Sequence, residues 1–355
     1  MIFQEGNAEM KLQTLFSLLT SGRLALYLQF DSVLRQAYRS SFVAAGLAEG
    51  LYARLSEGPA TLDQLHQCLI GRPSPGTPSG EAATREKLQA WLEMGVSLGE
   101  LKLTPEGYVI RSRRSRQLAE PGNDALAALY QEVLTMHHDL ILQTPARLRE
   151  QRFFTFADMD GELIARSSRV LEPYILEAVD SVVREKGAFR LLEVGCGSGV
   201  YIRHACHRNG DLQAVGLELQ PDVAEYARKN LQAWGLAERV RVDTGDIRTY
   251  ASPDRFDLVT LHNNIYYFPI SERADLIRRL VNLLKPGGKL MVTTACQGSQ
   301  QTLALNLWGE MTEGAGPLPE PEAVSDLMNL AGLISPRKTE LVPGSGFYAF
   351  VGAKN

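Results

Sequence analysis

The chain has 355 residues, of which 45% are hydrophobic and 22% are charged. This length exceeds one usual domain, so we expect two domains, each with its own core. A formal net charge of −4 gives no general attraction to nucleic acid or to an anionic membrane, and it favours small-molecule partners.

The cysteines and the N-terminal stretch predict a cytoplasmic protein. The cysteines show no paired spacing, as expected of reduced thiols, and they are Cys68, Cys196, Cys206 and Cys296. Glu5 and Glu9 stand where a signal peptide would be basic, and a Ser-Gly-Arg break interrupts the apolar run at residues 12–30. We therefore expect neither export nor a membrane span.

Residues 1–120 are predicted to form a mainly α-helical domain. Apolar residues recur at helical spacing through residues 9–55, and Thr61 is a candidate N-cap for a short helix. Residues 72–80 are rich in Pro, Ser and Gly and predict a loop before a further helix over about residues 81–98.

A hairpin is predicted next, over residues 101–110, where apolar residues alternate around a turn. Helices followed by a hairpin in this order are typical of a winged-helix domain. Such a domain can place a helix in the major groove of DNA, and the arginines of residues 111–116 could contact phosphates. Glutamates dilute the basic residues of the preceding helix, however, so we expect nucleic acid to be an improbable partner.

Residues 121–186 are predicted to be helices that bridge two domains and form a wall of an acceptor pocket. The periodicity predicts a long helix over residues 124–149 and further helix over residues 162–186. Pro173 should mark a kink or the start of a new helix.

A glycine-rich turn opens the third region, residues 187–355. The apolar residues from Leu191 onward read as a buried parallel strand, and glycines follow at Gly195, Gly197 and Gly199. A dinucleotide site places its third glycine where Val200 stands here. Glu193 would repel a pyrophosphate but attract an ammonium group. The spacing therefore favours S-adenosylmethionine over NAD.

Further strands are predicted along this region. A strand over residues 212–217 ends at Glu218, and a strand over residues 240–242 leads to Asp246 and Ile247. The two strands after them are predicted over residues 256–261 and, beyond a Lys-Pro-Gly-Gly turn, over residues 290–292. A C-terminal helix and hairpin are expected to close the sheet with an antiparallel edge; they cover residues 321–331 and 337–352.

These landmarks resemble the class I S-adenosylmethionine-dependent methyltransferases, whose first motif reads acidic-x-G-x-G-x-G. The motif is matched by Glu193, Gly195, Gly197 and Gly199. The resemblance implies that Glu218 accepts both ribose hydroxyls, and that Asp246 meets the adenine amino group. It also implies that Leu219 and Ile247 contribute to the cofactor site, with Ile247 against the adenine ring.

The order of the domains is similar to that in the small-molecule O-methyltransferases and their C-methylating relatives. The resemblance implies an α/β fold in which a winged-helix-like domain precedes a Rossmann-like, mostly parallel sheet. It also implies a homodimer that transfers a methyl group to oxygen or carbon of a small metabolite. The alternative is a winged-helix DNA-binding regulator that uses the methyltransferase fold as a cofactor sensor.

The segment after the fourth strand is expected to carry the chemistry, because ligands bind beyond the carboxyl ends of parallel strands. Plant-type O-methyltransferases have a His-Asp-Trp signature there that includes the catalytic base, whereas this chain has Tyr266-Tyr267-Phe268. The candidate catalytic residues are His262, Asn264 and Tyr266. His262 could act as a base with a near-neutral pKa, and Asn264 could orient a carbonyl or hydroxyl.

No metal site is predicted. Some relatives that methylate 2-oxo acids hold iron, and His262 together with His137 or His138 could supply ligands, but no second histidine follows His262. Only one of the two adjacent histidines can face a given pocket. His204 and Cys206, on the helix after the glycine turn, are expected to pack or to face solvent.

Overall fold

The computed structural model describes residues 8–71 and 81–355, so the loop predicted at residues 72–80 lies outside the described residues. Contacts divide the chain into two compact units. The N-terminal unit contains the residues up to Met136 together with 162–167, and the C-terminal unit contains 137–161 and 168–355. The segment 121–186 is therefore divided between the units, with 121–136 and 162–167 in the N-terminal unit and the rest in the C-terminal unit.

The N-terminal unit is mainly helical. Its helices are α1 (Ala8–Thr20), α2 (Arg23–Ala48), α3 (Leu51–Ser56), α4 (Leu62–Leu69), α5 (Glu81–Ser97), α6 (Arg113–Leu118), α7 (Asp124–Glu132) and most of α9 (Gly161–Ser167). The predicted hairpin is present as β1 (Leu101–Thr104) and β2 (Gly107–Ile110). Thr61 caps α4 as predicted. Its hydroxyl oxygen accepts the backbone N–H of Gln64, and the side-chain oxygen of Gln64 accepts the backbone N–H of Thr61.

A fully buried carboxylate ties the hairpin of this unit to two of its helices. Glu100 lies just before β1 and accepts hydrogen bonds from Arg39 of α2 and Ser115 of α6. Arg114 also pairs with Glu100 at 3.8 Å, and Arg116 donates to a backbone carbonyl of β2 at 3.0 Å. Two of the arginines considered as DNA contacts are thus engaged within the unit.

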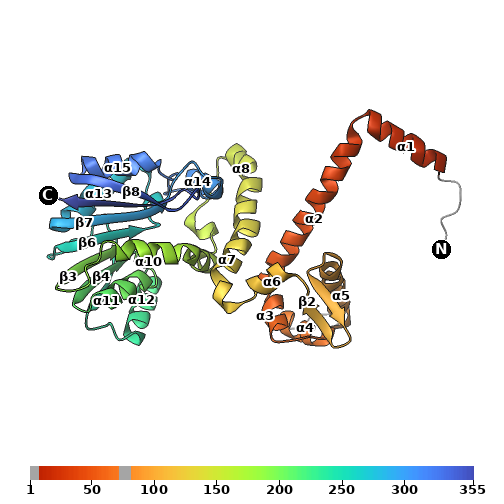
Figure 1. The fold of residues 1–355 in the computed structure, drawn as a ribbon, viewed down its shortest axis with the longest axis horizontal. Helices are drawn as coiled ribbons and strands as arrows, with labels where there is room; N and C mark the ends of the chain where they lie inside the picture. The colour runs from red at the N-terminus through yellow and green to blue at the C-terminus, as the bar shows by residue number, and fades with distance from the viewer. Residues whose placement is uncertain (1–7, 72–80) are drawn as a thin grey trace. The chain divides into compact units, whose positions relative to one another are not determined.

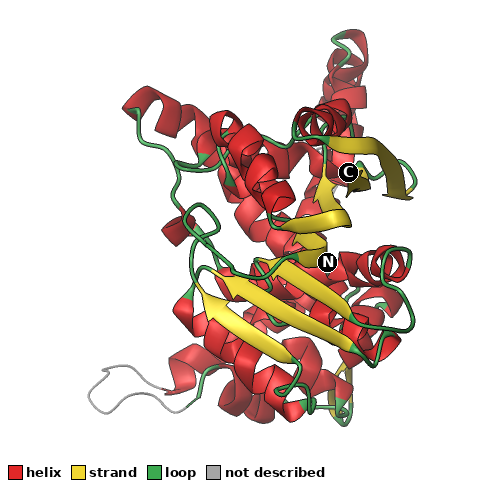
Figure 2. Ribbon diagram, turned by 90° about the vertical axis from the view of Figure 1, so that its left-hand side faces the viewer, coloured by secondary structure: helices red, strands yellow, loops and turns green. Residues whose placement is uncertain are grey.

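A seven-stranded sheet forms the centre of the C-terminal unit, in the order β5-β4-β3-β6-β7-β9-β8. The strands are β3 (Phe189–Val194), β4 (Leu212–Glu218), β5 (Val240–Thr244), β6 (Phe256–His262), β7 (Leu284–Ala295), β8 (Leu333–Val342) and β9 (Phe347–Lys354). The first five in spatial order are parallel, and β9 runs antiparallel to both β7 and β8. Figure 2 shows the strands in yellow. The predicted C-terminal hairpin therefore joins the sheet through its second strand.

Helices cover both faces of this sheet, which explains why the central strands β3, β4 and β6 are almost continuously buried. Figure 1 shows α10 (Glu172–Asp180), α11 (Val200–Arg208) and α12 (Pro221–Ala233) on one side. The other side carries α13 (Ile270–Asn282) and α15 (Pro321–Leu330), which contact each other. Among the described residues, no helix combines the length and the apolar character that crossing a bilayer requires.

The helical stretch predicted over residues 124–149 is present, but it contains a π-helical turn. This turn covers Val133–His137 and stands between α7, which ends at Glu132, and α8 (His138–Glu150). A π turn inserts a residue and changes the helical phase, which a reading of apolar spacing does not reveal. Pro173 lies in the first turn of α10, in agreement with the predicted start of a new helix.

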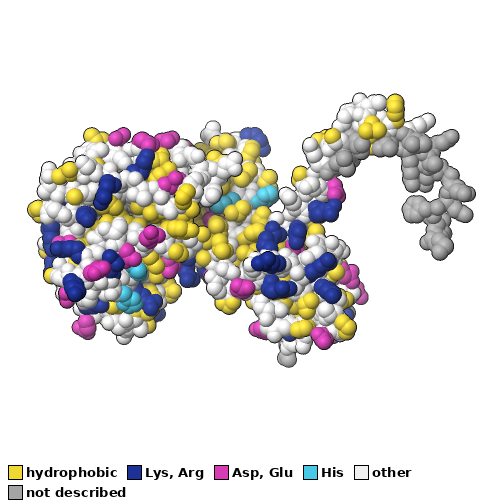
Figure 3. All heavy atoms as spheres, viewed as in Figure 1, with side chains coloured by type: hydrophobic (Ala, Val, Ile, Leu, Met, Phe, Trp, Pro, Cys, Tyr) yellow, Lys and Arg dark blue, Asp and Glu magenta, His cyan; other side chains and the backbone are white. Residues whose placement is uncertain are grey.

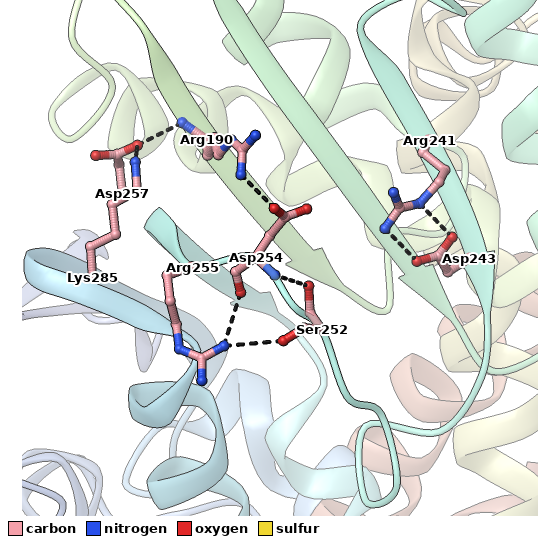
Figure 4. A network of polar contacts seen from close by, with 8 residues as sticks. All are labelled: Arg190, Arg241, Asp243, Ser252, Asp254, Arg255, Asp257 and Lys285. Carbon is pink, nitrogen blue, oxygen red and sulfur yellow. Dashed lines mark hydrogen bonds and ion pairs between the residues drawn. The ribbon is translucent and has the colours of Figure 1, made fainter.

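Ion pairs hold the amino ends of the central strands together (Figure 4). Asp257 of β6 accepts the backbone N–H of Arg190 on β3 at 2.8 Å and the Lys285 ammonium at 2.7 Å. The Arg190 guanidinium in turn pairs with Asp254 at 2.6 Å. The predicted site residues lie at or just beyond the opposite, carboxyl ends of the parallel strands.

Candidate active site

The turn between β3 and α11 has a backbone that glycine favours. Gly195, Gly197 and Gly199 have φ angles of +68°, +52° and +79°, in the left-handed region. A Cβ atom on Gly195 would lie 1.9 Å from Nδ2 of Asn264. The absence of a side chain therefore lets the segment after β6 pack directly on this turn.

The carboxylate of Glu218, at the end of β4, is hydrogen-bonded to the glycine turn. Its Oε2 accepts the N–H of Gly197 at 3.1 Å, and its Oε1 accepts the N–H of Gln220 at 3.2 Å. Each oxygen keeps a further lone pair, and the side chain is partly exposed. Glu218 can therefore accept hydroxyl groups of a ligand while it fixes the turn.

Glu193 in β3 is a second acidic group at this place, but it is only 1% exposed. Its Oε2 has no hydrogen-bond partner among the described residues. Burial, with the charge of Glu218 as a second cause, raises the pKa of Glu193 well above its ordinary value. A buried carboxyl oxygen without a donor fits a ligand group that donates, such as an ammonium.

The tip of β5 carries Asp246 and Ile247 and adjoins β4, because Gly245 donates its N–H to the Glu218 carbonyl at 2.9 Å. Asp246 accepts the N–H of Arg248 at 2.8 Å, which fixes its carboxylate in a tight turn. Ile247 is buried, whereas Leu219 is exposed. The tips of β3, β4 and β5 thus bring the predicted cofactor residues to one edge of the sheet.

His262 ends β6 and is buried. Its Nδ1 is hydrogen-bonded to the Thr293 hydroxyl of β7 at 2.8 Å, and its Nε2 has no partner among the described residues. Burial lowers the pKa of His262 to about 3, so the near-neutral pKa expected from the sequence is wrong. The neutral imidazole is a weak proton acceptor, but its Nε2 can form one hydrogen bond with a ligand.

Tyr201 is a site neighbour that the sequence reasoning missed. It lies in the first turn of α11, and its ring centroid is 4.8 Å from that of His262. Its position two residues after Gly199 could have identified it, because the first turn of that helix borders the glycine turn. Asn263, with φ +49°, redirects the chain after β6 so that Asn264 reaches Gly195.

An aromatic cluster stands after β6, in and around the 3-10 turn Ile265–Tyr267. Trp308 of α14 (Leu303–Met311) has its ring 6.3 Å from Tyr266, 5.6 Å from Tyr267 and 6.0 Å from Phe156. Trp308 Nε1 and Thr312 Oγ1 are buried without a hydrogen-bond partner among the described residues. Phe156 and Trp308 carry no motif, so only the fold identifies them.

The histidines considered as metal ligands lie on helices. His137 closes the π-helical turn and His138 begins α8, while His204 is hydrogen-bonded to Asp180 of α10 at 2.8 Å. Burial raises the pKa of the Cys206 thiol to about 11, so it stays protonated. The described residues contain no group of three His, Cys, Asp or Glu side chains arranged to hold a metal ion.

Sequence comparison connects this region with methyltransferases. The family described as "Methyltransferase domain" matches residues 191–288, a range that contains every predicted cofactor and catalytic residue. The ubiquinone biosynthesis O-methyltransferase of Xanthomonas euvesicatoria pv. vesicatoria is 32% identical over 137 residues, which are 39% of this chain and 54% of that protein. The chain thus spans about half the length of this curated relative.

Comparison of structures extends the likeness over nearly the whole chain. The mitomycin 7-O-methyltransferase MmcR has a TM-score of 0.74 at 18% identity, covering 95% of this chain and 100% of that one. Human N-acetylserotonin methyltransferase, solved in complex with SAM, has a TM-score of 0.69 at 16% identity, covering 93% and 98%. Residues 191–288 therefore resemble a methyltransferase domain, and the chain shares its mixed α/β fold with these solved methyltransferases.

Proposed function

We propose that this protein transfers a methyl group from S-adenosylmethionine to oxygen or carbon of a small molecule. The observation that carries the proposal is the pair of acidic residues at the tips of β3 and β4. Glu218 is hydrogen-bonded to the glycine turn, and Glu193 has a buried oxygen without a partner. Both lie in the residues matched by the methyltransferase family.

The residues present fit this cofactor. Glu218 would hold the ribose hydroxyls, Glu193 the ammonium group, and Asp246 the adenine amino group. The exposed Leu219 and the buried Ile247 would supply apolar contact for the adenine. The bound cofactor supplies an electrophilic methyl group on a sulfonium; this chain's residues bind it and hold the acceptor in line.

The acceptor side is proposed to be the aromatic cluster of Phe156, Tyr266, Tyr267 and Trp308. Flat, apolar rings favour a flat acceptor, and the unpartnered Trp308 Nε1 and Thr312 Oγ1 offer it hydrogen bonds. His262 would orient the acceptor through Nε2 rather than remove a proton, because its pKa is about 3. Positioning of this kind can supply roughly 7–11 kcal/mol of barrier lowering without a base.

The N-terminal unit is proposed to act as a winged-helix-like dimerisation domain. The helices α1 and α2 expose large apolar side chains, which a second copy of the chain would cover. These side chains are Phe16, Leu19, Leu26, Phe30, Val33 and Tyr38. Sedimentation of the wild type and of Leu26→Asp should give a dimer and a monomer respectively, whereas two monomers would contradict the proposal.

We do not favour the alternative of a DNA-binding regulator. Arg114 and Arg116, two of the arginines it requires, are engaged by Glu100 and by a β2 carbonyl.

The described cysteines are all unpaired, which is consistent with the cytoplasmic location that we propose.

Calorimetric titration tests the cofactor assignment most directly. The protein should bind S-adenosylmethionine and S-adenosylhomocysteine but not NAD. A labelled-methyl assay with phenolic and heteroaromatic compounds should then yield S-adenosylhomocysteine in proportion to methylated product. Failure to bind either adenosyl compound would overturn the proposed function.

A further inference from the structure

The protonation state of Glu193 before a ligand binds follows from its surroundings. The side chain is 1% exposed, and its Oε2 has no hydrogen-bond partner among the described residues. An ionised carboxylate there would be a buried charge removed from water without compensation, which costs several kcal/mol or more. The uncharged acid avoids that cost.

The elements packed around Glu193 present acidic or neutral groups. These groups are Glu218 on β4, Cys196 in the glycine turn, Tyr201 on α11 and Thr260 on β6. Glu218 is the charged group that acts on Glu193, and as a like charge it disfavours ionisation. Glu172 on α10 acts on Tyr201, and the His262 ring packs on the Tyr201 ring; neither is among the groups that act on Glu193.

Two neighbours could have reversed this conclusion, and neither does. Arg228 acts on the Cys196 thiol, but its guanidinium pairs with the Glu225 carboxylate at 3.3 Å, and Glu218 is the charge that acts on Glu193. Thr260 is the register partner of Glu193 on β6, and its own hydroxyl is buried without a partner. The groups around Glu193 therefore supply no positive charge that would stabilise its ionised form.

We propose that Glu193 is protonated in the ligand-free protein and loses that proton when the ammonium group of the cofactor binds. The O–H bond of the acid breaks, the proton passes to the buffer, and the carboxylate forms an ion pair with the ammonium. This inference rests on the proposed function, since the ligand is S-adenosylmethionine. Cofactor affinity should consequently rise with pH, by up to about tenfold per pH unit, until Glu193 is ionised in the free protein as well.

Calorimetry in two buffers with different ionisation enthalpies measures the released proton. At about pH 6.5 the amino group of the ligand already carries its proton, so only the protein can supply one. Titration with S-adenosylmethionine should give binding enthalpies that differ by the difference between the two buffers' ionisation enthalpies, which corresponds to the release of about one proton. Titration with 5′-methylthioadenosine, which lacks the amino-acid part, should give the same enthalpy in both.

Two variants locate the source of the proton. Glu193→Gln should bind without proton release, whereas the matched control Glu185→Gln, an exposed carboxyl before β3, should behave like the wild type. Binding by the wild type without proton release would overturn the inference and leave the proposed function standing. Release that persists in Glu193→Gln would overturn it as well. Absence of any binding by the wild type would overturn the proposed function and this inference together.

Discussion

Two buried glutamates, one in each unit, differ in what surrounds them. Glu100 is 0% exposed and accepts hydrogen bonds from Arg39 and Ser115. Glu193 is 1% exposed and leaves Oε2 without a partner. The same side chain at the same burial is thus a structural anchor in the N-terminal unit and an unsatisfied group at the candidate active site.

The difference shows that the partners of a buried charge indicate its role better than its burial does. A carboxylate whose lone pairs are filled by the protein stabilises its surroundings and leaves little for a ligand to add. One that lacks donors costs stability in the free protein, and a ligand that supplies the donor recovers that cost.

Among the substitutions that we propose, the removal of Glu100 should have the largest effect, and it should lower the free energy of unfolding. Glu100→Ala leaves the buried Ser115 hydroxyl and the Arg39 guanidinium without their acceptor, so we expect a loss of about 2–3 kcal/mol in the free energy of unfolding. Urea denaturation followed by circular dichroism measures it. Glu106→Ala, in the exposed hairpin turn, is the control and should unfold like the wild type; equal midpoints for Glu100→Ala would contradict the anchor role.

Removal of Glu218 should weaken cofactor binding by about 10- to 100-fold, the equivalent of one or two charged hydrogen bonds. Glu218→Ala loses the acceptor that fixes the N–H of Gly197 as well as the proposed ribose contact. Calorimetric titration with S-adenosylhomocysteine provides the dissociation constant. Glu225→Ala, an exposed carboxyl on α12, should keep the wild-type value; an unchanged constant for Glu218→Ala would refute the ribose assignment.

Glu193→Gln should stabilise the ligand-free protein increasingly as pH rises. The folded-state pKa of Glu193 is raised, so between the unfolded pKa and the folded pKa the native state binds more protons than the unfolded state. Stability of the wild type therefore falls with rising pH in that window, by at most about 1.4 kcal/mol per pH unit, and this contribution is absent in the variant. Denaturation at several pH values should show that the difference in unfolding free energy between the variant and the wild type grows as pH rises. A difference that stays constant with pH would show that Glu193 is not the titrating group.

His262→Ala should give the smallest effect, a reduction of turnover by about tenfold with unchanged cofactor affinity, since it removes one neutral hydrogen bond. Because burial lowers the pKa of His262 to about 3, its ionisation should not appear in the pH dependence of kcat at neutral pH. An acidic limb near pH 6.5 in the wild type that vanishes in the variant would restore His262 as a base. Thr293→Val, which removes the partner of Nδ1, should raise KM for the acceptor.

The fold of the C-terminal unit was predictable because its strands and turns are local patterns. An apolar run that ends at Glu218 and another that leads to Asp246 mark buried parallel strands, and the glycines after Glu193 mark a turn that other residues do not favour. The π-helical turn at Val133–His137 was missed, since apolar spacing does not reveal a single inserted residue.

The candidate site was predictable only where its residues belong to those patterns. Tyr201 and Asn264 lie near motif residues, yet their contacts with His262 and Gly195 cross between elements. Phe156 and Trp308 come from opposite ends of the C-terminal unit's sequence and meet only when α14 packs beside the turn after β6. Pairings over such separations leave no trace in the spacing of residues.

The amino-acid sequence by itself determined the order of the strands along the chain, the glycine turn and the acidic residues that follow it, because each depends on neighbours a few positions away. The tertiary structure alone decided the chemical state of the side chains. His262 has a pKa of about 3 and Glu193 is unpartnered because of what the sheet and helices bring around them. Burial and hydrogen bonding are properties of the packed chain, and they set which groups can bind, donate or exchange a proton.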